Sequence, residues 1–92
     1  MHVKIWSREQ CHFCDSAERA CERLDKSADD FSYEVVKLDI DYEVEDFTSH
    51  FPYAKTVPQI VVDGKHIGGW DQFREIANDI EFKMRQCRLA LK

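Results

Sequence analysis

The sequence has little glycine and proline: its 92 residues include three Gly and two Pro. With so few of these residues, it contains no flexible linker, low-complexity segment or internal repeat. Hydrophobic residues make up 43% of the chain and charged residues 34%. This length and composition predict one domain, residues 1–92, whose modest core needs no metal or disulfide staple.

An excess of positive charge and long apolar runs are also missing. The formal charge is -5, which disfavours nucleic acids and anionic membranes as partners on electrostatic grounds. No apolar run approaches the ~20 residues that span a bilayer, and no secretory or targeting segment is recognisable. Four cysteines are compatible with a secreted disulfide framework, but without a signal segment we expect a reducing, cytoplasmic location.

Two of these cysteines, Cys11 and Cys14, stand three positions apart at the start of a helical pattern. One turn apart on one helix face, their sulfurs are close enough to bond to each other. At the first exposed position, Cys11 would meet unpaired N–H groups and the positive end of the helix dipole. These favour the thiolate, which attacks disulfides and binds metals. The spacing indicates a redox site; two buried structural cysteines are the alternative.

Hydrophobic periodicity predicts an α/β chain in the order β-α-β-α-β-β-α. Strands are predicted at residues 2–6, 33–38, 60–62 and 65–67, with Asp63-Gly64 as a tight hairpin turn and a break at Gly68-Gly69. The first strand, helix and second strand predict a right-handed parallel unit. We therefore expect a four-stranded mixed sheet flanked by three helices on its two faces, with a site beyond the carboxyl ends of the parallel strands. The helical stripes are Cys14, Ala17, Ala20, Cys21, Leu24 and Ala28; Val44, Phe47 and Phe51; and Phe73, Ile76, Ile80, Met84, Cys87 and Leu91.

Aspartates mark the predicted starts of the two later helices. Asp39 and Asp41 offer N-caps for the second helix, and Asp71 offers one for the last. The carboxylates between Asp39 and Asp46 are expected on a solvated face.

The remaining two cysteines are expected in the core. Cys21 follows Cys14 by seven residues, a rise of ~10.5 Å along a helix, whereas a disulfide allows ~4.4–6.8 Å between Cα atoms. Cys87 falls on the apolar stripe of the last helix. Both are interpreted as small core residues.

Three motifs, in this order and spacing, resemble those of dithiol glutaredoxins: Cys11-His12-Phe13-Cys14, Thr56-Val57-Pro58 and Gly68-Gly69-Trp70-Asp71. The resemblance covers roughly residues 2 to 80 and is most specific between Thr56 and Gly69. It implies a thioredoxin fold with Pro58 in the cis form beside the cysteines. It also implies a glutathione-dependent thiol–disulfide oxidoreductase that acts on glutathione mixed disulfides and protein disulfides.

The resemblance assigns the chemistry to the cysteine pair, with Cys11 as nucleophile and Cys14 as resolving thiol. His12 stands where the family commonly has proline, which affects the redox potential and the stiffness of the loop. We consider two roles for His12, a proton donor to Cys11 or a solvated spectator. Phe13 replaces the usual tyrosine as a wall of the substrate groove.

The resemblance also implies a glutathione site. Arg8 would meet a glutathione carboxylate, or remain an ordinary solvated charge, and the backbone at Val57 would pair with the peptide like an added strand. Asp71 would face the γ-glutamyl ammonium, and the N–H groups at the helix start would face its carboxylate. Trp70 would either line the groove or anchor the helix. The implied set is Arg8, Phe13, Thr56, Val57, Pro58, Gly69, Trp70 and Asp71.

Rival functions remain at this stage. One is an iron–sulfur cluster carrier, formed by two chains through Cys11 and two glutathiones, although dedicated carriers have serine where Cys14 stands. Another is a thioredoxin-like donor fed by a flavoprotein reductase; Arg8 and the Gly-Gly-Trp-Asp run favour glutathione instead. A structural zinc site needs four ligands, and no second CxxC or HxxxH exists, so no metal is expected.

The expected partners follow from the leading hypothesis. They are glutathione, as reductant and co-substrate, and disulfide-containing client proteins. Ribonucleotide reductase is a common client of such small dithiol proteins. We expect the chain to act as a monomer.

Overall fold

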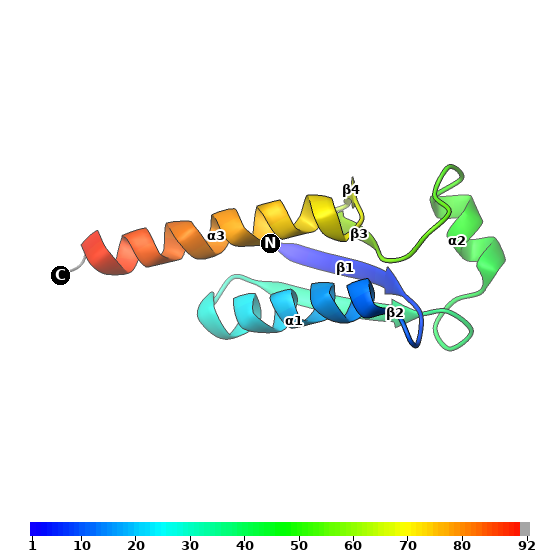
Figure 1. The fold of residues 1–92 in the computed structure, drawn as a ribbon, viewed down its shortest axis with the longest axis horizontal. Helices are drawn as coiled ribbons and strands as arrows, with labels where there is room; N and C mark the ends of the chain where they lie inside the picture. Colours follow the sequence, from blue (N-terminus) through cyan, green and yellow to red (C-terminus); the bar gives the residue numbers. More distant parts are fainter. Residues whose placement is uncertain (91–92) are drawn as a thin grey trace.

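The structure is a computed structural model that describes the backbone of residues 1–90 and the side chains of residues 1–85 (Figure 1). These residues form four strands and three helices, which confirms the predicted order β-α-β-α-β-β-α. The elements are β1 (His2–Ser7), α1 (His12–Ser27), β2 (Ser32–Lys37), α2 (Val44–His50), β3 (Gln59–Val62), β4 (Lys65–Gly68) and α3 (Trp70–Ala90).

The four strands form one mixed sheet in the order β2-β1-β3-β4. β1 runs parallel to β2 and antiparallel to β3, and β3 and β4 form the predicted hairpin. Its turn residues Asp63 and Gly64 have φ values of 50° and 82°, the left-handed geometry that matches the twist of a two-residue hairpin. β2 begins one residue earlier than predicted because its register pairs Ser32 with His2.

One face of the sheet packs against α1 and α3, which lie side by side (Figure 1). The side of α1 that faces the sheet is made of small residues, so the helix approaches closely, and only Leu24 on it is large. Cys21 is fully buried there, as predicted. The buried core on this face comprises Val3, Ile5, Ala17, Ala20, Cys21, Leu24, Phe31, Ile60, Phe73 and Ala77.

The opposite face carries a smaller aromatic cluster around Trp6, which the alternation along β1 points away from α1. Tyr42 and Phe51 contact its ring with centroid distances of 4.8 Å and 5.4 Å. Phe47 of α2 packs against the same cluster, so helices lie on both faces, as predicted. The Tyr42 hydroxyl donates a hydrogen bond to the Ser7 carbonyl at 2.6 Å. Burial raises the pKa of this hydroxyl, with a further contribution from Asp39, so the donor stays protonated.

The predicted N-caps of the second helix are wrong. Asp39 adopts a left-handed φ of 64°, and the Asp41 carboxylate accepts the Lys37 backbone N–H at 2.9 Å, so both residues belong to the turn that ends β2. α2 begins only at Val44, behind a capping box in which Glu43 is the N-cap and the Asp46 carboxylate accepts the Glu43 N–H at 3.1 Å. Five acidic side chains of this segment are exposed, as expected: Asp39, Asp41, Glu43, Glu45 and Asp46.

The predicted cap of the last helix is also wrong by two positions. α3 begins at Trp70, and Asp71 is its second residue. The cap is closed instead by the Gln72 side chain, whose Oε1 accepts the Gly69 N–H at 2.9 Å. β4 includes Gly68, whose φ of 132° turns the chain from the strand into the helix, so the predicted break lies one residue later.

α3 extends well past the end of the sheet (Figure 1). Phe73 is fully buried and Ile80 and Met84 are half-buried, which confirms the predicted stripe along this part of the helix. The Cys87 side chain and Leu91 lie outside the described residues. Within the described part of the chain, no helix is both long and apolar enough to cross a membrane.

Candidate active site

The cysteine pair at the start of α1 forms a disulfide, with the Cα atoms of Cys11 and Cys14 5.2 Å apart. Cys11 is the N-cap residue, and its Sγ accepts the Cys14 backbone N–H at 3.3 Å. Cys11 is 8% exposed and Cys14 only 2%. The sulfurs therefore bond as predicted, and Cys11 is the more accessible of the two.

The local backbone explains why Cys11 occupies this position. Gln10 adopts a left-handed φ of 56° that ends the loop after β1, and the Cys11 carbonyl then accepts the Asp15 N–H at 3.0 Å as the first helical bond. The sulfur of Cys11 thus faces the free N–H groups and positive end of a 16-residue helix. After reduction, this environment favours a thiolate at Cys11.

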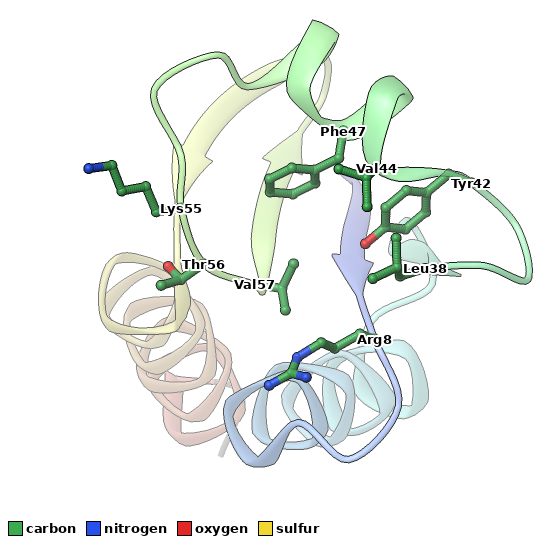
Figure 2. A pocket seen from close by; sticks show the side chains of 8 residues that line it. All are labelled: Arg8, Leu38, Tyr42, Val44, Phe47, Lys55, Thr56 and Val57. Atoms are coloured by element: carbon green, nitrogen blue, oxygen red, sulfur yellow. The ribbon is translucent and has the colours of Figure 1, made fainter.

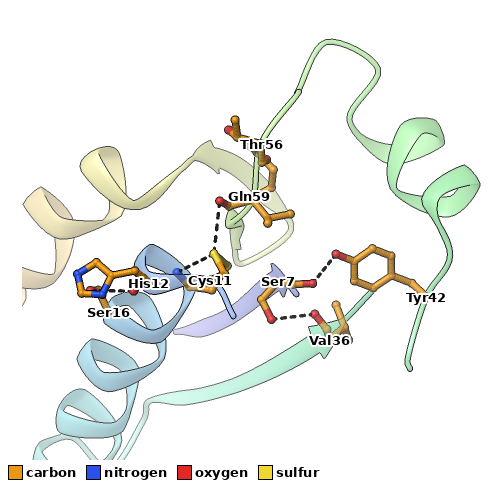
Figure 3. Close-up of a disulfide and its surroundings, with 10 residues drawn as sticks. Ser7, Cys11, His12, Ser16, Val36, Tyr42, Thr56 and Gln59 are labelled. Atoms are coloured by element: carbon orange, nitrogen blue, oxygen red, sulfur yellow. Dashed lines mark hydrogen bonds between the residues drawn. A yellow bond between two sulfur atoms is a disulfide. The ribbon is translucent and has the colours of Figure 1, made fainter. Parts of the chain in front are cut away.

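The Thr56-Val57-Pro58 segment lies directly against this sulfur (Figure 3). The Val57–Pro58 peptide bond is cis, as the resemblance implied. The Val57 carbonyl oxygen lies 3.7 Å from Cys11 Sγ. The backbone of Val57 therefore borders the sulfur of Cys11.

Gln59 holds this segment in place, a role that sequence reasoning missed. Gln59 is buried, with 7% of the residue exposed, and its Nε2 donates a hydrogen bond to the Thr56 carbonyl at 2.8 Å. The other end of the amide, Oε1, lies 2.7 Å from His66 Nε2 on β4. The sequence did carry a signal for this role, because Gln59 is a polar residue at the start of β3, whose other residues, Ile60 to Val62, are apolar.

One groove, of about 350 Å³, opens beside this segment; we call it the Trp70 groove. It brings together seven of the eight residues predicted to bind glutathione and adds Gln72, which the sequence did not single out. Trp70 is half-buried, packs against the core and lines this groove. The lining residues are Phe13, Thr56, Val57, Pro58, Gly69, Trp70, Asp71 and Gln72.

The eighth predicted residue, Arg8, lines a second groove of about 340 Å³, the α2 groove (Figure 2). The two grooves share Thr56 and Val57, so they meet at the segment beside Cys11. Lys55 also lines the α2 groove and was not predicted. The full lining is Arg8, Leu38, Tyr42, Val44, Phe47, Lys55, Thr56 and Val57.

Two further candidates are His12, next to Cys11, and the thiol of Cys21 in the core. His12 is exposed, and its ring packs edge-on against Phe13 with a centroid distance of 5.7 Å. Burial raises the pKa of the Cys21 thiol to about 12, and the nearby Glu18 carboxylate adds to the rise, so this thiol stays protonated and unreactive. Within the described residues, no group of three or more His, Cys, Asp or Glu side chains is gathered to hold a metal ion.

Comparison with known proteins agrees with this geometry. The profile of the glutaredoxin-like domain family matches residues 2–85. Glutaredoxin 1 of Salmonella typhimurium is 35% identical over 87 residues, covering 86% of this chain and 93% of the relative. Glutaredoxin 1 of Escherichia coli is 37% identical over 79 residues, covering 79% of this chain and 88% of the relative.

The fold agrees as well. The solved structure of reduced Escherichia coli glutaredoxin superimposes with a TM-score of 0.75 at 33% identity, covering 86% of this chain and 95% of that one. The sheet order and helix placement are thus those of the thioredoxin fold, as expected. With its redox-active disulfide at Cys11 and Cys14, the chain belongs to the glutaredoxin family and is a thiol–disulfide oxidoreductase.

Proposed function

We propose that this oxidoreductase takes its electrons from glutathione and reduces both glutathione mixed disulfides and protein disulfides. The observation that carries the proposal is the Trp70 groove. It runs from the backbone beside Cys11 to Asp71 at the start of α3, and seven predicted glutathione-binding residues line it. Glutaredoxins as a family use glutathione, which supports the same assignment.

The two grooves together accommodate an extended tripeptide. Thr56 and Val57 line both, so a peptide paired with the Val57 backbone reaches into each groove. At one end, the γ-glutamyl ammonium faces the exposed carboxylate of Asp71, and the N–H groups that start α3 face its carboxylate. At the other end, the glycyl carboxylate lies within reach of Arg8, with Lys55 adding positive charge.

The chemistry is a transfer of two electrons by thiol–disulfide exchange. The Cys11 thiolate attacks one sulfur of a substrate disulfide, a mixed disulfide forms, and the other substrate sulfur leaves as a thiolate that takes up a proton. Cys14 then attacks Cys11 Sγ, which restores the Cys11–Cys14 disulfide and releases the second substrate thiol. Two glutathione molecules reduce this disulfide and become one molecule of glutathione disulfide.

The setting of this activity is part of the proposal. We expect disulfide-containing proteins as clients, ribonucleotide reductase being one candidate, and a monomer as the working form. A cytoplasmic location fits a dithiol that works as a reductant, because glutathione is kept reduced there.

The electron source is the direct test. The protein is supplied with bis(2-hydroxyethyl) disulfide and either glutathione, NADPH and glutathione reductase, or NADPH and thioredoxin reductase alone. We expect NADPH oxidation only with the glutathione system. Turnover with thioredoxin reductase, and none with glutathione, would instead establish the thioredoxin-like donor.

A further inference from the structure

The segment beside Cys11 is held by a pair of hydrogen bonds that starts outside both grooves. The Gln59 Nε2 donates to the Thr56 carbonyl at 2.8 Å, and the Gln59 Oε1 lies 2.7 Å from Nε2 of His66 on β4. His66 lines neither the Trp70 groove nor the α2 groove. Neither the redox chemistry nor the proposed glutathione site therefore gives this histidine a role.

The Thr56 carbonyl decides which way the Gln59 amide faces. A carbonyl oxygen only accepts hydrogen bonds, so the end of the amide that faces it is the NH2 group. The Oε1 end then faces His66, and an amide oxygen is also only an acceptor. Nε2 of His66 must therefore carry a proton, as it does in the imidazolium ion and in one of the two neutral tautomers.

The sheet and one aromatic ring place the His66 imidazole against Gln59. His66 pairs with Val61 between β4 and β3, and Val61 lies two residues beyond Gln59. Residues two apart on a strand point to the same face, so His66 and Gln59 are diagonal neighbours. Phe51 packs against the imidazole with a centroid distance of 4.6 Å. His66 itself is exposed and buries little apolar area, so its main contribution is the hydrogen bond to Gln59.

Loss of the His66 donor would affect a buried group. Gln59 is 7% exposed, so its Oε1 would be left unpaired unless the side chain turned. If it turns, Nε2 leaves the Thr56 carbonyl, and the backbone at Val57 becomes less ordered. A peptide that pairs with this backbone must then order it on binding, which weakens the binding. A small disulfide that meets only the sulfur of Cys11 is not affected in this way.

We propose that His66 is a positioning residue for thiol–disulfide exchange with peptide substrates. Its Nε2–H aligns the Gln59 amide, and the amide holds the Thr56 carbonyl. The backbone that follows is thereby kept beside Cys11, whose Sγ lies 3.7 Å from the Val57 carbonyl oxygen. His66 touches no reacting atom and acts only through Gln59. The inference rests on the proposed function for the pairing of a glutathione peptide with the Val57 backbone.

Two substitutions separate the hydrogen bond from the ring. His66→Phe keeps an aromatic ring against Phe51 and removes the donor, whereas His66→Gln keeps an N–H donor on a side chain of similar reach. Each pre-reduced variant reacts in single turnovers with a glutathionylated peptide and with bis(2-hydroxyethyl) disulfide. We expect His66→Phe to lower the second-order rate constant for the peptide about three- to tenfold, the range that one net hydrogen bond covers. The small disulfide should be nearly unaffected, and His66→Gln should restore the rate with the peptide.

His50→Phe is the matched control, because His50 is also exposed and packs against the same Phe51 ring, with a centroid distance of 6.1 Å. Its Nδ1 lies 2.9 Å from the Asp46 carbonyl oxygen, so it has no part in the contact with Gln59. His50 lines neither groove. This variant should react with both substrates at the rates of the unmodified protein.

NMR of the imidazole nitrogens tests the hydrogen bond without any substrate. We expect the neutral His66 ring to carry its proton on Nε2, and Gln59→Met to remove this preference. A neutral His66 protonated on Nδ1 would overturn the assignment.

The kinetics can overturn it as well. An unchanged rate with the peptide in His66→Phe, equal losses on both substrates, or equal effects of His66→Phe and His50→Phe would each do so, as would a His66→Gln variant as slow as His66→Phe. If the tautomer and the contrast between substrates are found but glutathione supplies no electrons, only the proposed function fails.

Discussion

Asp71 offers the sharpest test of the glutathione site, through the substitution Asp71→Asn. Its carboxylate lines the Trp70 groove from the second position of α3, where it would face the γ-glutamyl ammonium. Asparagine keeps the shape of the side chain and removes its charge. The KM for a glutathione mixed disulfide should therefore rise, while activity on bis(2-hydroxyethyl) disulfide stays near normal in single turnovers without glutathione.

The exposure of Asp71 sets the size of the effect. A charge-assisted hydrogen bond contributes roughly 1.5–3 kcal/mol where water is excluded. Asp71 is exposed, so solvent screening reduces the expected contribution to about 0.2–1 kcal/mol. This range corresponds to a rise in KM of about 1.4-fold to fivefold. Added salt should shrink the difference between the variant and the unmodified protein.

The assay compares steady-state KM values for a glutathionylated peptide, with Asp79→Asn as control. Asp79 is exposed on the same helix, pairs with Lys83 at 3.0 Å and lies outside the groove. Thermal unfolding is measured in parallel, because Asp71 in the first turn also stabilises α3 by about 0.3–1 kcal/mol through the helix dipole. A lower melting temperature with an unchanged KM would mean that Asp71 stabilises the helix and binds nothing.

Three further predictions concern residues that support the site. Burial raises the pKa of Cys21 to about 12, above its ordinary value of 9.0, so the unfolded chain loses this proton first. The free energy of unfolding should therefore fall as pH rises above ~9, by up to ~1.4 kcal/mol per pH unit. Alkaline denaturation of the oxidised protein should show this slope, and in Cys21→Ala the slope should be smaller, with the part contributed by a tyrosine of raised pKa, Tyr42, left in place. Gln59→Met leaves the Thr56 carbonyl without its donor, so it should lower the free energy of unfolding by about 1–3 kcal/mol and raise the KM for glutathione substrates. Urea unfolding measures the first effect and steady-state kinetics the second. A destabilised variant with an unchanged KM would show that Gln59 does not position the segment. Gly68→Ala should destabilise by about 1 kcal/mol or more in the same assay, because φ is 132° and a Cβ would lie 3.0 Å from Gln72 Oε1.

The strands and the two long helices were predictable because their burial follows a simple period. Val3 and Ile5 alternate along β1, and Ala17, Ala20 and Leu24 recur along α1, and all five are fully buried. Each pattern points one face of its element at the sheet or the helices. The sequence therefore contains enough information to place these elements.

α2 was harder to predict because a seven-residue helix has no buried residue of its own. Its start depends on competition among acidic residues for backbone N–H groups. The Asp41 carboxylate accepts the backbone N–H of Lys37, and the Asp46 carboxylate accepts the backbone N–H of Glu43. Any of these side chains is a good cap in isolation, so only the three-dimensional turn decides which one caps the helix.

The motifs predicted most of the candidate site but not its support. Cys11 and Val57 come together from segments 46 residues apart because β1 and β3 are neighbours in the sheet. The Gln59–His66 contact and the Gln72 cap depend on side-chain geometry that no periodicity reports. Arg8 was predicted to meet a glutathione carboxylate, and only the structure shows that it lies on a second groove.

The division of labour between the two cysteines is the central claim, and Cys11→Ser and Cys14→Ser test it directly. A serine hydroxyl is not ionised near neutral pH, so Cys11→Ser should abolish all thiol exchange. Cys21→Ser and Cys87→Ser serve as controls and should keep near-normal activity.

The decisive measurement is the activity of Cys14→Ser on a glutathione mixed disulfide and on a protein disulfide, both with the glutathione system. Free glutathione resolves the Cys11 adduct in the first case, so much of the activity should remain. The second case needs the intramolecular attack by Cys14, so much of the activity should be lost. A folded Cys14→Ser protein that is inactive on both substrates would contradict the assignment.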